Sequence, residues 1–291
     1  MSYNEGTSEK YGWEPSWFGA DDFGHELIEK VKEFQRSLGI TADGLVGPST
    51  FRRIFAHREA NIDDYEPAGE NIVYNGKFFP IKWDKVILWD DARGLESNKG
   101  TYQDYSGLPP RDITMFVNHW DACLNSKSCA KILNRRGISV HFCIDNDGTI
   151  YQLADLQHAC WHAGNRQINR SSVGVEISNA YYLKYQDWYA ARTGPRPIVT
   201  DAVVHGRTLE PHLGFYPVQI EALKALWEAV ANACDIPLEA PMKSGELDTG
   251  VNREVKSGDF KGFINHYNIT DGKIDCAGLD LVNLLNEVKA D

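Results

Sequence analysis

The 291-residue sequence has few positive charges and no long apolar run. Lys and Arg total 30 against 41 Asp and Glu, which gives a formal net charge of −11. This acidic balance argues against nucleic acid or an anionic membrane surface as the main partner. No apolar run approaches the ~20 residues needed to span a bilayer, so membrane insertion is not expected. The first residues include neither a basic nor an apolar segment and therefore predict no secretory signal peptide.

The sequence also lacks the cysteine spacing of a small disulfide-stapled domain. Without a signal peptide, its six cysteines are expected to be mostly free thiols in a reducing cytosol, although Cys123 and Cys129 could pair. What the sequence does have is a 42% hydrophobic fraction, which is enough for a sizeable core. Its length suits one large domain, or a medium domain with a small one.

Residues able to bind a metal gather towards the end of the sequence. His266, Lys273, Asp275 and Cys276 lie within eleven residues, and His119 ends an apolar run far upstream. Imidazole and thiolate are ligands that zinc prefers. Two histidines and a cysteine would fill three tetrahedral positions and leave the fourth for water, which is the arrangement of a catalytic zinc site.

The N-terminal part predicts helices. Apolar residues recur at spacings of four, three and four, as on one face of a helix: Leu27, Val31, Phe34 and Leu38. Asp43-Gly44 indicates a turn, and Pro48 suits the start of a second helix. Residues 31–35 and 43–50 together resemble the peptidoglycan-binding type 1 repeat, a three-helix module of bacterial wall hydrolases. The resemblance covers residues 8–58; the alternative is a helical hairpin that only packs on the main domain.

Residues 59–80 are polar and acidic, and they predict a linker. Residues 81–291 follow as the main domain, in which expected strands alternate with expected helices, indicating an α/β domain around one sheet. The strands are expected at 113–117, 139–144, 149–153 and 173–177, and the helices at 128–134, 220–234 and 279–285. Residues 181–214 and 239–260 fit neither period and are expected to be insertions that border a cleft.

Six short motifs in the main domain resemble, in order, the zinc-dependent N-acetylmuramoyl-L-alanine amidases related to peptidoglycan-recognition proteins, the type 2 amidase family. The motifs are Val117-Asn118-His119, Ser139-Val140-His141-Phe142, Asp147-Gly148-Thr149-Ile150, Trp161-His162-Ala163-Gly164, Ser172-Val173-Gly174-Val175-Glu176 and the segment from His266 to Gly278. The resemblance implies a central mixed β-sheet flanked by helices, preceded by a small three-helix domain. It also implies one Zn²⁺ per chain and cleavage of the amide between N-acetylmuramic acid and L-alanine.

The same resemblance implies His119, His266 and Cys276 as the zinc ligands. Some members use an aspartate two residues after a lysine, and that spacing would make Asp275 the third ligand instead of Cys276. Without the family match, Cys276 could equally be a small buried apolar residue.

Two residues are implied to be catalytic. Glu176 corresponds to a glutamate that transfers protons in one branch of the family, and Lys273 would stabilise the developing oxyanion. On residue type alone, Glu176 could be a surface carboxylate and Lys273 a solvated loop lysine. Trp161 and His162 are expected to line the cleft, with His162 a substrate contact or a hydrogen-bond donor to a ligand rather than a ligand.

The expected partner is bacterial peptidoglycan, with no nucleic acid, no membrane insertion and no obligate protein partner. A wall hydrolase with a wall-binding module and no export signal resembles a bacteriophage endolysin, made in the host cytoplasm and acting on the wall after release. Two other functions stay open: a recognition protein that binds peptidoglycan without cutting it, and a zinc endopeptidase acting on the same polymer.

Overall fold

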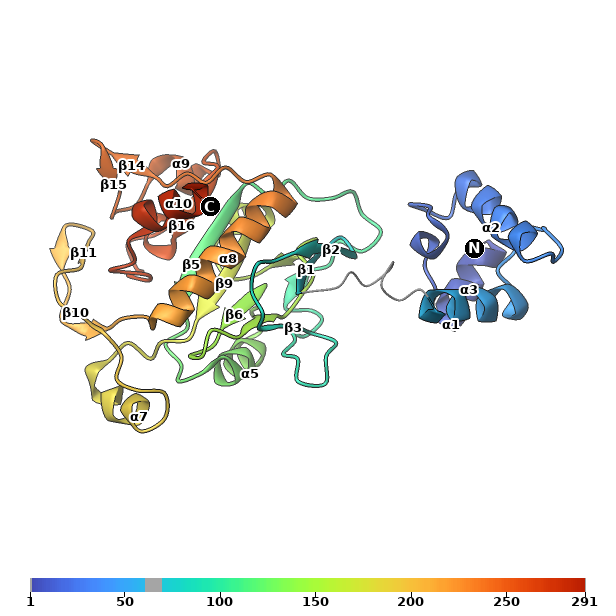
Figure 1. Ribbon diagram of the computed structural model, residues 1–291. Coiled ribbons are helices and arrows are strands. Elements are labelled where there is room, and N and C mark those ends of the chain that lie inside the picture. Colours follow the sequence, from blue (N-terminus) through green and yellow to red (C-terminus); the bar gives the residue numbers. More distant parts are fainter. Residues whose placement is uncertain (1, 61–69, 291) are drawn as a thin grey trace. The chain divides into compact units, whose positions relative to one another are not determined.

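The computed structural model describes residues 2–60 and 70–290 and divides the chain into two compact units, Met1–Ala68 and Gly69–Asp291 (Figure 1). Each unit has a hydrophobic core of its own. All six cysteines are free thiols. Within the described ranges, no helix combines the length and the apolar character needed to cross a membrane.

The first unit is helical, as expected. It contains the α-helices α1 (Tyr3–Tyr11), α2 (His25–Ser37) and α3 (Pro48–Ala60) and the short 3₁₀-helix η1 (Pro15–Phe18). Helix α1 begins before the expected boundary at residue 8, and Ser2 caps its first turn. The periodicity of the sequence could not reveal α1 because the helix has no apolar stripe: its buried residues are Asn4 and Thr7.

Two buried amides hold the loop between α2 and α3. The side chain of Gln35 donates to Leu45 O (3.1 Å) and accepts from Gly44 N (2.9 Å). The side chain of Asn4 donates to Gly44 O (3.0 Å) and accepts from Val46 N (2.9 Å). Gln35 thus takes the inward position, whereas Leu38, expected on the buried stripe, is 42% exposed because α2 ends at Ser37.

The expected linker is wrong over residues 71–80, which form a β-hairpin of β1 (Asn71–Tyr74) and β2 (Lys77–Pro80). Asn75 and Gly76 connect the strands with φ of 52° and 69°, the conformation that favours Asn-Gly in tight hairpins. The hairpin is tied to the main domain through Gln152, whose side chain accepts from Val73 N (2.8 Å) and donates to Val73 O (2.7 Å). Residues 61–69 of the expected linker lie outside the described residues.

The second unit is built around a six-stranded mixed sheet, which confirms the expected fold class (Figure 1). The strand order is β16 (Gly262–Asn265), β5 (Met115–Trp120), β9 (Ser172–Ile177), β6 (Phe142–Ile144), β7 (Ile150–Gln152) and β3 (Val86–Leu88). All neighbours are parallel except β6 and β7, which are joined by the expected hairpin.

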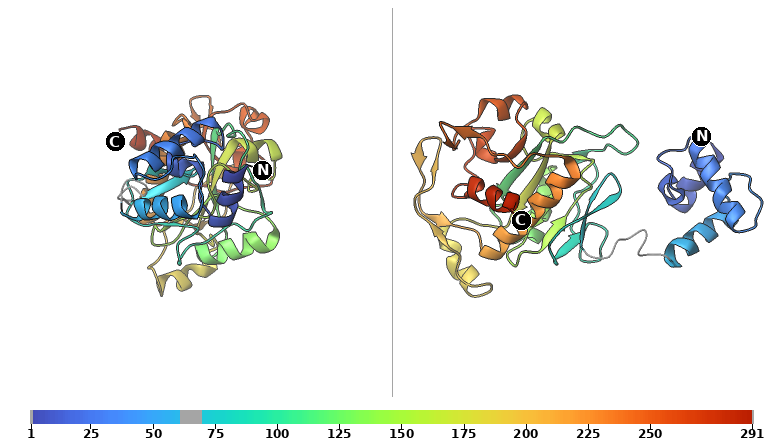
Figure 2. Two further views of the ribbon diagram at one scale, coloured as in Figure 1. Left: turned by 90° about the vertical axis from the view of Figure 1, so that its right-hand side faces the viewer. Right: turned by 45° about the horizontal axis from the view of Figure 1, so that its top comes forward.

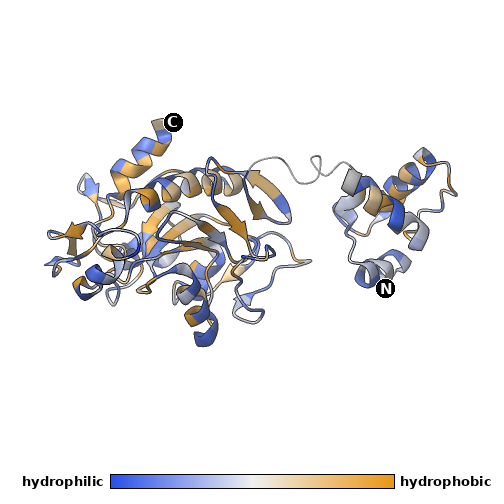
Figure 3. Cartoon of the chain, turned by 60° about the horizontal axis from the view of Figure 1, so that its bottom comes forward, coloured by the Kyte–Doolittle hydropathy of each residue, from blue (hydrophilic) through white to orange (hydrophobic). Residues whose placement is uncertain are grey.

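Helices cover both faces of this sheet. Phe116 and Val173 belong to the core that contains α8 (Pro217–Cys234) and α10 (Leu281–Ala290), and Figure 2 shows α8 crossing that face. Met115 and Val117 point the other way, into a cluster with Ile168 of α6 (Arg166–Ser171), and α5 (Ser126–Arg136) packs on β6 and β9. Much of the length of the strands is accordingly hydrophobic (Figure 3).

The remaining elements are short. Residues 181–214 hold η2 (Leu183–Tyr185), α7 (Gln186–Ala190) and two strand pairs, β10 (Ile198–Val199) with β13 (His212–Leu213) and β11 (Val203–Val204) with β12 (Arg207–Thr208). Residues 239–260 hold the pair β14 (Met242–Lys243) and β15 (Glu246–Leu247) and helix α9 (Arg253–Ser257). Strand β4 (Tyr102–Gln103) pairs with β8 (Ala159–Cys160), and η3 (His266–Asn268) follows β16.

Candidate active site

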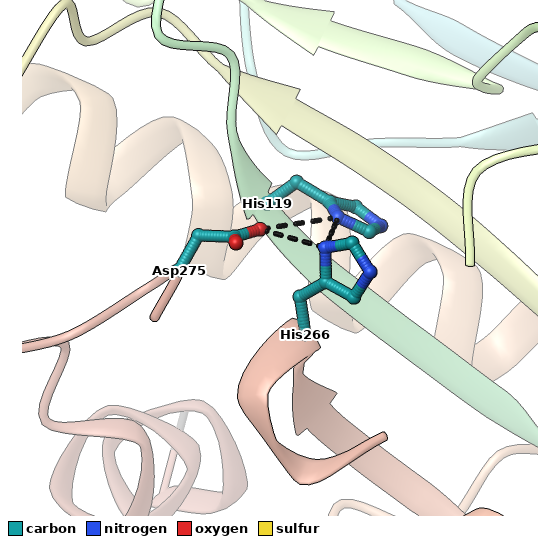
Figure 4. Close-up of side chains that lie close together, drawn as sticks. All are labelled: His119, His266 and Asp275. Carbon is teal, nitrogen blue, oxygen red and sulfur yellow. Dashed lines mark hydrogen bonds and ion pairs between the residues drawn. The ribbon is translucent and has the colours of Figure 1, made fainter. Parts of the chain in front are cut away.

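Polar side chains meet at the carboxyl ends of the central parallel strands. His119 lies near the end of β5, and Glu176 is its register partner in β9, so both point away from α8. His266 comes directly after β16, which runs parallel to β5 on the other side. Asp275 reaches the same place from the following loop (Figure 4). In α/β sheets this edge is where ligands bind.

Three of these side chains converge on one point. The distance from His266 Nδ1 to Asp275 Oδ2 is 2.9 Å, from His119 Nδ1 to His266 Nδ1 2.9 Å, and from His119 Nδ1 to Asp275 Oδ2 3.3 Å (Figure 4). Zinc–ligand bonds near 2.0–2.1 Å in a tetrahedral site would separate ligand atoms by about 3.3 Å. A single proton cannot form a hydrogen bond in all three of these contacts, whereas a cation at their centre would bind all three atoms. The donor set therefore fits a zinc ion.

The pKa shifts of His119 and Asp275 also suit metal binding. Burial lowers the pKa of His119 to about 4, helped by the neighbouring His266, so its imidazole is neutral at pH 7. Burial opposes ionisation of Asp275, but the close contacts with His119 and His266 outweigh burial and lower the pKa of this carboxyl below its usual range. Two histidines and a carboxylate are a known ligand set of catalytic zinc.

The structure places Asp275, and not Cys276, against the two histidines. Cys276 is fully buried among the apolar side chains around α8 and α10. Adjacent residues of this loop thus face opposite ways, one into the site and one into the core. The sequence-based choice of Cys276 is corrected to Asp275, the alternative that the lysine spacing had left open.

The carboxyl group of Glu176 is partly buried. Burial raises its pKa well above the usual range, and the charges of Asp121 and Asp275 add to the effect. Its Oε2 has no hydrogen-bond partner among the described residues. Such a group binds a proton strongly and has an oxygen available to exchange one, which suits proton transfer.

Two cavities adjoin at the site. The larger, about 690 Å³, is bordered by Trp161, His266 and three cationic side chains, Arg136, Lys256 and Lys273. The smaller, about 310 Å³, contains His119, Glu176, Asp275 and Tyr181. Lys273 and His162 border both. Trp161 is 40% exposed and also borders a third cavity of about 500 Å³. Both expected insertions therefore contribute to the cleft, through Tyr181 and Lys256.

His162 contacts a metal-binding candidate directly. Its Nδ1 lies 3.0 Å from His119 Nε2, and its Nε2 lies 3.3 Å from Ser172 Oγ. A Cβ atom on Gly174 would come within 2.7–2.8 Å of the His162 ring. Sequence reasoning missed Ser172 and Gly174. The available signal was the alternation of residues 172, 174 and 176 along one strand, which puts their side chains on the same face as His119.

Comparison with known proteins agrees with this picture. Residues 109–276 match the family described as N-acetylmuramoyl-L-alanine amidase, and residues 10–54 match the putative peptidoglycan binding domain. No curated protein sequence matches the chain.

Similar solved structures carry related names. An N-acetylmuramyl-L-alanine amidase AmiD from E. coli, in complex with anhydro-N-acetylmuramic acid-L-Ala-D-γ-Glu-L-Lys, is 18% identical, with a TM-score of 0.41 over 66% of this chain and 66% of that one. The amidase LysC from Clostridium intestinale is 14% identical, with a TM-score of 0.41 over 70% and 97%. A mutant endolysin from Bacillus subtilis is 16% identical, with a TM-score of 0.36 over 71% and 97%.

The first family match includes Glu176, both histidines and Asp275, and it covers more than half of the 291 residues. The chain therefore belongs to the N-acetylmuramoyl-L-alanine amidase family and carries a peptidoglycan-binding module in front of the amidase domain.

Proposed function

We propose that this peptidoglycan amidase depends on one zinc ion per chain, held by His119, His266 and Asp275. The observation that carries the proposal is the convergence of two ring nitrogens and one carboxylate oxygen within 3.3 Å of one another. When bound, zinc would polarise the scissile carbonyl and lower the pKa of a water molecule. Three protein ligands leave a tetrahedral position open for that purpose.

The remaining roles fall to residues around the smaller cavity. Glu176 takes a proton from the attacking water and delivers it to the nitrogen of L-alanine as the amide breaks. Lys273, in the wall of both cavities, stabilises the negative charge that develops on the carbonyl oxygen. Trp161 offers a partly exposed aromatic face to the substrate at the edge of the larger cavity.

The charge around the larger cavity supports an acidic substrate. Arg136, Lys256 and Lys273 border it together with one carboxylate, Asp271, although the chain has a net charge of −11. A stem peptide, which carries carboxylates, is attracted to such a cleft. We also propose that the protein acts in the lysis of a bacterial host by a phage, because it joins a wall hydrolase to a wall-binding module.

Digestion of purified muropeptides, followed by mass spectrometry, tests the reaction. An amidase releases stem peptides with a free N-terminal alanine and leaves the lactyl group on the sugar. Cleavage within or between stem peptides would instead show an endopeptidase, and unchanged muropeptides would show a recognition protein.

Elemental analysis and chelation test the metal. The purified protein should hold about one zinc per chain, lose activity on chelation and regain it when zinc is added. Full activity after prolonged chelation, with no zinc detected, would contradict the proposed cofactor.

A further inference from the structure

We propose that His162 and Ser172 are positioning residues that hold His119 in the tautomer required of a metal ligand. The proposal rests on the proposed function, since it takes His119 to bind the metal through Nδ1. Neither residue touches the point where the three candidate ligands converge. They act through His119, by a hydrogen-bond chain that runs from its far ring nitrogen to the backbone of α6.

The direction of this chain follows from the chemistry of imidazole. A neutral histidine carries one proton on its two nitrogens. If His119 offers the lone pair of Nδ1 to a metal, its proton is on Nε2, which then donates to His162 Nδ1 at 3.0 Å. His162 in turn carries its proton on Nε2 and donates to Ser172 Oγ at 3.3 Å. The Ser172 hydroxyl donates to Ile168 O at 2.7 Å.

Each group in this chain of hydrogen bonds has one assignment as donor or acceptor that satisfies both of its neighbours. The carbonyl of Ile168 can only accept, so the Ser172 proton points towards it and an oxygen lone pair faces His162. His162 therefore donates from Nε2 and accepts at Nδ1. The chain fixes a proton on His119 Nε2 and leaves Nδ1 free of one. Uncharged groups achieve this, and a hydrogen bond from the far nitrogen makes an imidazole ligand more basic.

The His162 ring is held firmly in place. Asn169 Oδ1 accepts from the backbone nitrogens of His162 (3.2 Å) and Ala163 (2.8 Å), which fixes the chain at this point. Gly174 gives the ring room to lie against β9, because any side chain there would overlap it. Ser172 is fully buried, so water does not compete for its hydroxyl.

This arrangement gives His162 a role that differs from both roles left open by the sequence, because its ring accepts a hydrogen bond from the candidate ligand His119 instead of donating one. Both ring nitrogens are engaged inside the protein, one by His119 and one by Ser172. No ring nitrogen is left to recognise a substrate. Positions 172, 174 and 176 of β9 thus serve the site in three ways: an anchor for His162, space for its ring, and the carboxylate of Glu176.

Zinc affinity, measured by equilibrium competition with a chromogenic chelator, tests the proposal without relying on turnover. His162→Phe keeps a flat ring but cannot accept a hydrogen bond, and it should weaken zinc binding by roughly 10–100-fold. His162→Asn puts an amide oxygen near the position of Nδ1 and should recover most of that loss. Ser172→Ala should weaken binding by less than His162→Phe. Ser171→Ala is the matched control, because Ser171 Oγ donates to Gln167 O and does not contact His162.

Long-range ¹H–¹⁵N correlation spectra of the zinc-loaded protein give a second measurement. His119 and His162 should both appear as Nε2–H tautomers, and His119 Nε2–H should exchange more rapidly in His162→Phe. Circular dichroism checks that each variant is folded. If His162→Phe does not fold, zinc affinity is compared between His162→Asn, Ser172→Ala and the wild type.

Unchanged zinc affinity in folded His162→Phe, equal losses in His162→Phe and His162→Asn, or a proton on His119 Nδ1 would each overturn the positioning role alone. In those cases the wild-type protein still binds zinc and the proposed function stands. A wild-type protein that binds no zinc would overturn both.

Discussion

Asp275 and Cys276 show how much can depend on a single position. Zinc accepts either side chain as a ligand, and both fit a family spacing, one counted from Lys273 and the other from Gly278. The sequence could not choose between them, because the choice depends on which way an irregular loop faces. The structure directs the carboxylate to the histidines and the thiol to the core.

The two residues should therefore respond differently to substitution. Asp275→Asn removes the charged oxygen and should weaken zinc binding by more than roughly 100-fold, beyond the usual effect of changing a residue that only supports a ligand. Cys276→Ala should keep the zinc and lower the free energy of unfolding by about 1 kcal/mol, because a buried sulfur is lost from the core. Zinc titration and urea unfolding of both variants measure this. The reverse result, with zinc lost only from Cys276→Ala, would restore the original assignment.

Glu176 offers a separate test of catalysis. Glu176→Gln keeps the size of the side chain but cannot exchange a proton, so turnover should fall by roughly 10²–10⁴-fold. Zinc content should stay unchanged, because Glu176 is not among the three converging side chains. Release of peptide from muropeptides and elemental analysis would be measured on one preparation. A Gln variant that retains full turnover would assign proton transfer to another residue.

At the scale of elements, strongly periodic segments could be predicted and weakly periodic ones could not. The apolar strands β5 and β9 and the long amphipathic helix α8 were expected close to their observed bounds. Helix α1 was missed because its inward residues are polar. The hairpin β1–β2 was missed although Asn75-Gly76 is a strong turn signal, because the acidic residues before it suggested a continuous linker.

Gln35 should be essential to the N-terminal module. Gln35→Ala leaves the backbone nitrogen of Gly44 and the carbonyl of Leu45 without their side-chain partner, and each buried unpaired group costs about 1–3 kcal/mol. A module of this size has little stability to spare, so the variant should unfold at lower urea concentration and bind sacculi less. Glu33→Ala, on the same helix but with a 63% exposed side chain, is the control and should behave like the wild type. Equal midpoints for the two variants would show that the Gln35 contacts contribute little.

At the scale of the whole molecule, the division into two units has a direct test. All the residues proposed for catalysis lie in Gly69–Asp291, so a chain that begins at residue 70 should fold and cleave soluble muropeptides. It should bind intact sacculi more weakly than the full chain. Sedimentation with sacculi measures binding, and equal binding by both chains would mean that the N-terminal module only packs or links.

A second truncated chain tests whether residues 71–80 belong to the main domain or to the linker. A chain that begins at residue 81 lacks β1 and β2 and leaves the buried Gln152 side chain without its partners at Val73. It should therefore be less stable than the chain from residue 70 by a few kcal/mol, on the order of two to three lost buried pairings. Indistinguishable urea unfolding curves would show that residues 71–80 add no stability to the main domain, as expected of a linker.

The pairing of β16 with β5 has a consequence for how the enzyme is made. His119 and its two proposed co-ligands are separated by about half of the chain, and β16 is the last of the six strands of the sheet in sequence order. On the ribosome, a nascent chain can place His119 and Glu176 on neighbouring strands early, but the proposed set of ligands is not complete until residue 275 has been synthesised. Products that end before β16 therefore lack two of the three proposed ligands and should bind no zinc at this site.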